Sequence, residues 1–239
     1  MPELVTVPPY ARAPRVYGIS LVLVHATRGN ASMAAQYAAT KNYFASVPDM
    51  GGWAPNADVL IGAGGEIAEF GDWRTTRANW SAGFGFAGPP AEHGADEHAW
   101  SIELAQPASG EAYTEACIAS FIAYVRPVLQ EFNLPATRVL SWDQLTSQPV
   151  PRGLIGHEDT ANGKRFGKSD PGALFPWARV LVELAATPST PPPTDVLDLT
   201  VPAPRVEREM TSRYLGYNRA LGREEHEIVI REYVYRPAP

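Results

Sequence analysis

Residues 156–172 read Gly-His-Glu-Asp-Thr-Ala-Asn-Gly-Lys-Arg-Phe-Gly-Lys-Ser-Asp-Pro-Gly, and they gather a histidine, a lysine and an aspartate beside a proline and several glycines. The imidazole of His157 and the carboxylate of Asp170 suit zinc, which usually takes nitrogen, sulfur or oxygen ligands in tetrahedral geometry. Two protein ligands are too few, because a catalytic zinc typically has three and keeps one position open. The stretch therefore predicts part of a metal site whose third ligand comes from elsewhere.

The best candidate for the third ligand is His25. It ends an apolar run at residues 19–24, which is typical of a strand buried on both faces. Each candidate also has an ordinary structural interpretation. A histidine at a strand end is often a hydrogen-bonded core residue, and an aspartate before proline is typical of a turn or a helix cap. Spacing alone leaves both interpretations open.

Three blocks of the sequence stand out. They are Leu-Val-Leu-Val-His-Ala-Thr at 21–27, Ala-Trp-Ser-Ile-Glu-Leu at 99–104, and Gly-His-Glu-Asp at 156–159 with Gly-Lys-Ser-Asp-Pro-Gly at 167–172 and Phe-Pro-Trp at 175–177. Together they resemble the zinc-dependent N-acetylmuramoyl-L-alanine amidase family, which includes phage endolysins, cell-wall recycling amidases and peptidoglycan recognition proteins. The third block is similar to the family's Gly-His, Lys-x-Asp-Pro-Gly and Phe-x-Trp signature and is the most specific. The resemblance covers roughly residues 15–186.

The resemblance implies a zinc ion held by His25, His157 and Asp170, which would make hydroxide available near neutral pH. Glu103 is then the expected general base, which orients the water and carries its proton to the leaving nitrogen. Lys168 is expected to reach the developing oxyanion. The bond cut would be the amide between the lactyl group of N-acetylmuramic acid and L-alanine, so peptidoglycan or a muropeptide is the expected substrate.

By the same resemblance, the expected substrate groove lies between the loops around residues 53, 80 and 84–88. Trp53, Trp80 and Phe84 are candidates for its walls, with Thr27 beside the metal as a further substrate-binding candidate. Ser81 stands where the family frequently has histidine, so we expect no second catalytic imidazole.

Strands alternate with helices along the chain, which indicates an α/β fold with a central mixed β-sheet flanked by helices. Pro127 is expected to kink or interrupt the helix at 111–132. The expected elements are a strand at 19–24, a helix at 33–44, a hairpin at 58–62 and 66–70, a strand at 100–104, a helix at 111–132, a short strand at 154–155 and a helix at 176–184.

Composition divides the chain into four expected parts. Residues 1–14 are expected to form a proline-rich arm, 15–186 a catalytic domain, 187–204 a proline-rich linker and 205–239 an appendage. The appendage has one convincing strand, at 227–235, and is too small to fold alone. We expect it to pack on the catalytic domain, to pair with another chain, or to bind the cell envelope.

Charge and hydropathy exclude several classes of protein. A net charge of −6 gives no electrostatic footprint for nucleic acid, and the single cysteine, Cys117, excludes an intramolecular disulfide framework. No export signal and no apolar run of about 18 residues is found, so no membrane insertion is expected.

We therefore expect synthesis in the cytoplasm and action on the cell wall after release, as in a phage-type endolysin. The alternatives are a cytosolic amidase that recycles muropeptides, a non-catalytic peptidoglycan-binding module and a phage structural protein. The oligomeric state stays open.

Overall fold

The computed structural model describes residues 2–15, 17–29, 32–50, 54–78, 81, 95–106, 111–141, 150–186, 205–218 and 223–235. The chain divides into two compact units, residues 1–187 and 188–239. The linker expected at 187–204 lies outside the described residues. Within the described part of the chain, no helix combines the length and the apolar character that crossing a bilayer requires.

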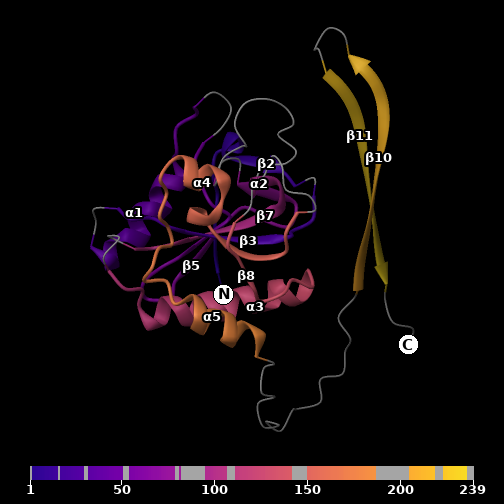
Figure 1. The fold of residues 1–239 in the computed structure, drawn as a ribbon. Helices are drawn as coiled ribbons and strands as arrows, with labels where there is room; N and C mark the ends of the chain where they lie inside the picture. The colour runs from indigo at the N-terminus through magenta and orange to yellow at the C-terminus, as the bar shows by residue number, and fades with distance from the viewer. Residues whose placement is uncertain are drawn as a thin grey trace, which may run out of the picture. The chain divides into compact units, whose positions relative to one another are not determined.

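A seven-stranded mixed sheet forms the centre of the first unit (Figure 1). Its strand order is β1-β5-β4-β7-β3-β9-β8, and all neighbours run parallel except β4 and β5. A small antiparallel sheet pairs β2 with β6. The strands are β1 (Glu3–Val5), β2 (Arg12–Pro14), β3 (Leu21–Ala26), β4 (Val59–Ile61), β5 (Ile67–Phe70), β6 (Thr76–Ala78), β7 (Ala99–Leu104), β8 (Arg138–Val139) and β9 (Gly153–Gly156).

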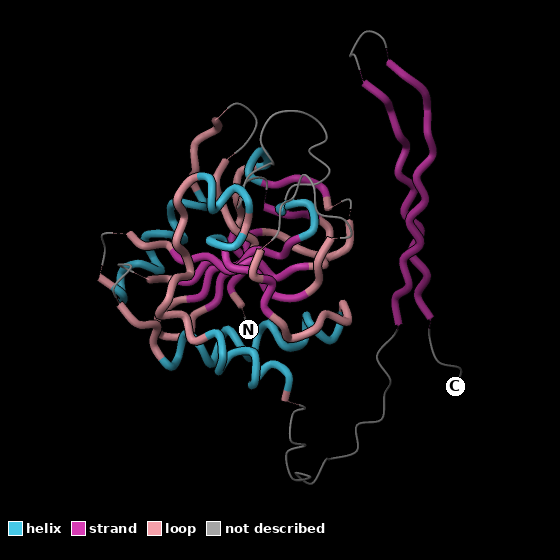
Figure 2. The backbone as a smooth tube through the Cα atoms, in the orientation of Figure 1, coloured by secondary structure: helices cyan, strands magenta, loops and turns pink. Residues whose placement is uncertain are grey.

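Helices cover both faces of this sheet (Figure 2). Helices α3 and α5 pack on one face, and α1 packs on the other. The expectation of an α/β fold with a central mixed sheet is therefore confirmed. The helices are α1 (Met33–Ala45), α2 (Ala95–His98), α3 (Glu115–Glu131), α4 (Ala161–Arg165) and α5 (Trp177–Ala185), with 3-10 turns at Pro9–Ala11 and His157–Asp159.

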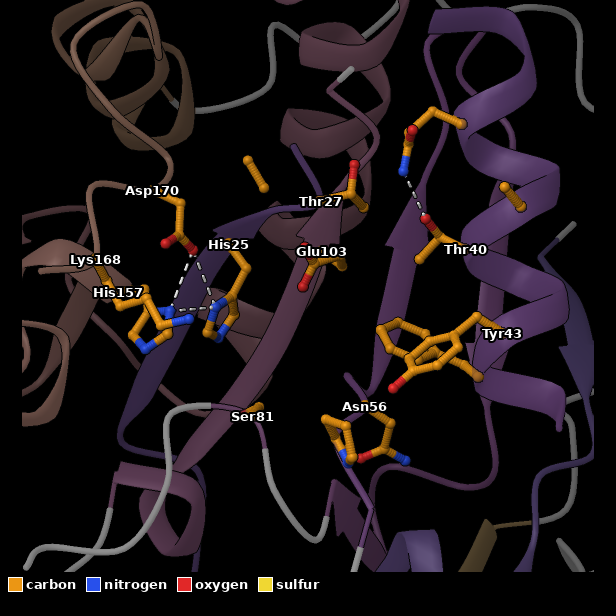
Figure 3. Close-up of a pocket in the computed structure, with 15 residues that line it drawn as sticks. His25, Thr27, Thr40, Tyr43, Asn56, Ser81, Glu103, His157, Lys168 and Asp170 are labelled. Atoms are coloured by element: carbon orange, nitrogen blue, oxygen red, sulfur yellow. Dashed lines mark hydrogen bonds and ion pairs between the residues drawn. The ribbon is translucent and has the colours of Figure 1, made fainter. Parts of the chain in front are cut away.

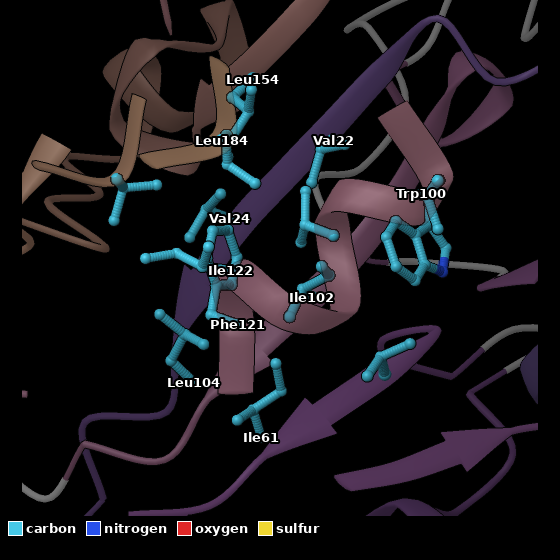
Figure 4. Packing of buried hydrophobic residues seen from close by; sticks show 14 of the residues in the cluster. Val22, Val24, Ile61, Trp100, Ile102, Leu104, Phe121, Ile122, Leu154 and Leu184 are labelled. Atoms are coloured by element: carbon cyan, nitrogen blue, oxygen red, sulfur yellow. The ribbon is translucent and has the colours of Figure 1, made fainter. Parts of the chain in front are cut away.

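The largest hydrophobic core lies between the sheet and the helices α3 and α5 (Figure 4). Alternation along β3 sends Val22 and Val24 into this core, whereas Leu21 and Leu23 face the opposite side. Each fully buried aliphatic side chain stabilises the fold by about 1.5–3 kcal/mol. The run at 19–24 therefore lacks polar alternation because both faces of β3 are covered.

Helix α3 runs through Pro127 without interruption, so of the two expectations for this position, a kink or an interruption, the interruption is wrong. A proline inside a helix costs about 3 kcal/mol. Val125, Val128 and Leu129 are all buried beside it, and together they outweigh that cost. Thr114 begins the helix by accepting a hydrogen bond from the Cys117 N–H, 3.1 Å from oxygen to nitrogen.

The N-terminal residues belong to the first unit. β1 pairs in parallel with β5 at the sheet edge, and β2 pairs with β6. The hydroxyl of Tyr10 donates to the Val47 carbonyl at 2.8 Å. Residues 1–14, expected to form an arm ahead of the domain, thus contribute strands to its sheets.

The second unit contains a β-hairpin. β10 (Arg205–Asn218) pairs antiparallel with β11 (Arg223–Tyr235), and the register shifts between Tyr214 and Gly216. Only the second strand was predicted from the sequence, because charged residues in 205–213 obscure the alternation of apolar residues that marks a strand. A two-stranded hairpin alone is marginally stable, so the three roles considered for 205–239 stay predictions.

Candidate metal centre and active site

Three adjacent parallel strands bring the candidate residues to one edge of the sheet. Across β3 and β7, His25 lies opposite Glu103. Across β3 and β9, Val24 lies opposite Gly156, so the next residue, His157, comes level with His25. The carboxyl ends of parallel strands are the usual position of a ligand site in α/β sheets. Three residues that are far apart in sequence therefore meet at this edge.

The period of two along a strand selects the face on which the site lies. His25 shares a face of β3 with Leu21 and Leu23, and Glu103 shares a face of β7 with Ser101. This face is opposite the core under α3 and α5. Figure 3 shows both side chains directed into a cavity that α1 borders on its far side.

Asp170 reaches the same edge on a loop that the rest of the domain holds in place. The Glu158 N–H donates to the Asp170 carbonyl at 2.9 Å, which ties the loop to the turn after β9. The hydroxyl of Tyr113 donates to the Pro171 carbonyl at 2.7 Å. Backbone contacts therefore position the carboxylate before any ligand binds.

The three side chains converge on one point. His25 Nδ1 and His157 Nδ1 are 3.1 Å apart, and Asp170 Oδ2 lies 3.2 Å from the His157 atom and 3.3 Å from the His25 atom. Two atoms that each lie about 2.1 Å from a tetrahedral zinc ion are roughly 3.4 Å apart. The triangle thus has the size of one face of a zinc coordination tetrahedron. Within the described ranges it is the one group of three or more potential metal ligands.

Electrostatics also fit a bound cation. Burial lowers the pKa of His25, and the neighbouring His157 lowers it further, so the imidazole is kept neutral with a free lone pair. Burial alone would raise the pKa of Asp170, but hydrogen bonds from His157 and His25 hold it well below its usual value. His25 Nε2 is buried and has no partner among the described groups. Two imidazoles and one carboxylate are a common donor set for zinc.

Glu103 is a second titratable group beside the triangle. Burial, followed by the charge of Asp170, raises its pKa to about 8, and the charge of Lys168 opposes this shift. A carboxyl group whose pKa lies near neutrality is suited to general acid–base catalysis. Lys168 lines the same cavity.

The cavity has a volume of about 440 Å³. His25, Glu103 and Asp170 line one end, and side chains of α1 line the other (Figure 3). Thr27 also lines it, but its hydroxyl donates to the Gln106 carbonyl at 3.0 Å and accepts from the Gln106 N–H at 3.1 Å. That hydroxyl therefore joins the chain segments that follow β3 and β7.

Five of the nine residues singled out in the sequence come together as expected, and a sixth, Thr27, lies at the cavity wall. The other three, Trp53, Trp80 and Phe84, lie outside the described residues.

A polar wall of this cavity, which consists of Gln36, Thr40 and Asn56, was not predicted from the sequence. Gln36 and Thr40 stand one turn apart on α1, and Asn56 precedes β4. The signal in the sequence is that two polar residues share one stripe of an alanine-rich helix.

Comparisons with known proteins agree with the geometry. The family model described as N-acetylmuramoyl-L-alanine amidase matches residues 15–173. No curated protein matches the chain.

Several solved structures share the fold. A selenomethionine derivative of AmpD is 20% identical, with a TM-score of 0.52 over 77% of this chain and 95% of that one. A mutant endolysin from Bacillus subtilis is 15% identical, with a TM-score of 0.51 over 77% of this chain and 99% of that one. The catalytic domain of XlyA is 15% identical, with a TM-score of 0.51 over 76% and 99%. At these identities the likeness concerns the fold.

Proposed function

The chain belongs to the N-acetylmuramoyl-L-alanine amidase family and is an enzyme of that class, and we propose that zinc bound by His25, His157 and Asp170 is its cofactor. The observation that carries this proposal is the triangle of ligand atoms with sides of 3.1–3.3 Å, which opens into the cavity beside Glu103. The chemistry that zinc supplies when bound is Lewis acidity, which makes hydroxide available near neutral pH.

In this proposal one residue of the chain transfers the protons and another stabilises the developing charge. Glu103 takes a proton from the attacking water and delivers it to the nitrogen of the L-alanine that leaves. Its raised pKa reflects a burial that favours the neutral acid, and this is the form that donates to the leaving group. Lys168 places a cation at the cavity wall, where it stabilises the oxyanion that develops on the lactyl carbonyl.

The substrate of this proposal is cell-wall peptidoglycan, as for a phage-type endolysin. The support is that the chain has a second unit, residues 188–239, in addition to the catalytic unit. A separate wall-binding unit raises the effective concentration of a catalytic domain on an insoluble polymer, whereas a soluble muropeptide needs no such unit.

One experiment tests the chemistry. Purified protein is assayed for bound metal and for new N-terminal alanine released from peptidoglycan, in wild type and in Glu103→Gln. We expect about one zinc per chain in both proteins and release of alanine by wild type alone. A metal-free wild type that releases alanine at the full rate would contradict the cofactor.

A second experiment separates the two substrates. Intact sacculi and soluble muropeptides are digested in parallel by the full chain and by a chain truncated after residue 187. We expect the truncation to slow digestion of sacculi while leaving hydrolysis of muropeptides unchanged. Equal rates on sacculi with and without residues 188–239 would instead favour the recycling amidase.

A further inference from the structure

The cavity has two chemically different halves. The half beside the metal centre contains the charged residues Glu103, Lys168 and Asp170. The opposite half contains the polar wall of Gln36, Thr40 and Asn56, and the described residues that line it include no charged side chain. A group bound against this wall is therefore polar and neutral, because a buried charge without a partner is strongly unfavourable.

Asn56 presents a free acceptor to the cavity. Its side chain is 4% exposed, and its Nδ2 donates to the Ala11 carbonyl at 2.8 Å. That bond determines the orientation of the amide, because the reverse orientation would place two acceptors against each other. Oδ1 is then the atom that has no partner among the described groups.

Gln36 presents a second acceptor from α1. Its side chain is 6% exposed, and its Nε2 donates to Thr40 Oγ1 at 3.2 Å, while Oε1 has no partner in the described part of the chain. Gly29 leaves room for this amide, since a Cβ there would lie 2.3 Å from Gln36 Nε2. A buried polar atom in a native protein is normally hydrogen-bonded, so two such oxygens at one cavity indicate a missing donor.

We propose that the polar wall of Gln36, Thr40 and Asn56 is a substrate subsite that binds a neutral amide N–H of the muramoyl peptide. An amide N–H offers the single donor that the free oxygen of Asn56 lacks. This inference rests on the proposed function. Such N–H groups flank the scissile bond on both sides, in the acetamido group of the sugar and in the amides of the stem peptide.

The test replaces one N–H-bearing group at a time with an uncharged ester. The parent substrate is N-acetylmuramoyl-L-alanyl-D-isoglutamine. The first analogue has an acetate ester in place of the acetamide on the sugar. The second has an ester in place of the amide between alanine and isoglutamine, and the third has a methyl ester in place of the isoglutamine carboxamide. We expect kcat/KM of the zinc-loaded enzyme to be lower by about 10-fold or more for the sugar analogue or for a peptide analogue than for the parent. The analogue that is affected identifies the N–H group that binds the wall.

A pair of asparagine variants localises the effect. Asn56→Ala removes the free acceptor. In this variant we expect the kcat/KM values for the parent and for the affected ester to agree within about 2-fold. Asn42→Ala is the matched control on the exposed side of α1 and is expected to discriminate as wild type does. Gln36→Met repeats the test at the second acceptor if Asn56→Ala folds poorly.

The outcomes distinguish the two levels of the proposal. If wild type hydrolyses the parent and all esters at the same rate, the wall binds water or a hydroxyl and the subsite is wrong, while the proposed function stands. If wild type hydrolyses none of these compounds or peptidoglycan, the proposed function itself is wrong. Retained discrimination in both wall variants would also overturn the subsite.

Discussion

Two of the buried aspartates in this domain, Asp58 and Asp170, differ in the groups that surround their carboxylates. Asp58 is 1% exposed and Asp170 is 8% exposed. The carboxylate of Asp58 is closed by protein groups: Arg12 lies 2.8 Å away, Arg15 lies 3.6 Å away, and backbone N–H groups of β6 and β7 donate at 2.8 and 2.9 Å. Every partner that this charge needs comes from the chain.

The carboxylate of Asp170 meets two imidazoles instead of two guanidinium groups. Its Oδ2 and the two Nδ1 atoms converge on one place, and one proton cannot bridge all three contacts. The comparison teaches that a buried carboxylate whose partners all come from its own chain is structural, whereas one in an incompletely bonded cluster of ligand atoms is prepared for a ligand.

Removal of the metal is expected to have the largest effect. Chelation, or His157→Ala, should lower hydrolysis by more than the roughly 100- to 1000-fold that loss of one oxyanion donor costs. The fold should survive, because the core under α3 and α5 does not include these side chains. Alanine release and circular dichroism, before and after zinc is restored, check this. Unfolding on chelation would break the comparison, since the open cluster would then be structural.

Asp58→Ala should lower the stability of the fold and leave the activity of folded molecules unchanged. It leaves two buried guanidinium groups without a counter-charge, and loss of one partner of a buried pair costs about 3–5 kcal/mol. We expect urea unfolding to show this loss, while activity per folded molecule stays at the wild-type level. Glu115→Ala breaks the exposed pair with Arg179 and serves as the control, with a cost below about 1 kcal/mol.

Lys168→Met should lower catalysis without affecting the stability of the fold. Loss of a donor to the oxyanion typically lowers kcat on the order of 100-fold. Lys168 is exposed, so the melting temperature should not change. Lys164→Met is the control, because Lys164 is also exposed and bonds to Ser141. Similar kcat values for the two variants would remove Lys168 from the mechanism.

The smallest expected effect concerns the pH dependence of stability in metal-free protein. The pKa of Glu103 rises from 4.5 to about 8 on folding, so the folded state binds an extra proton between these values. The free energy of unfolding should therefore decrease as the pH rises through this range, by at least about 1 kcal/mol relative to Glu103→Gln. Urea unfolding at pH 5 and pH 8, with a chelator present, measures the difference. Parallel pH profiles for the two proteins would contradict a buried neutral acid.

Prediction from the sequence succeeded where the pattern was local. The strand that carries His25, the hairpin of β4 and β5 and the helix at Glu115–Glu131 follow from apolar spacing and turn residues. It failed where tertiary partners override local preference. Pro127 stays inside a helix because the helical residues before and after it are buried in the hydrophobic core. Glu3–Val5 becomes a strand because it pairs with β5 at the edge of the sheet.

Residue types and short motifs by themselves determined the family and named the candidate ligands, because a metal selects ligand chemistry that is visible in the residues. The shared register of β7, β3 and β9 and the wall that α1 builds opposite Glu103 were decided only by the tertiary structure. The physical reason is that distances across a sheet depend on strand order and packing, which the separation of residues along the chain does not encode.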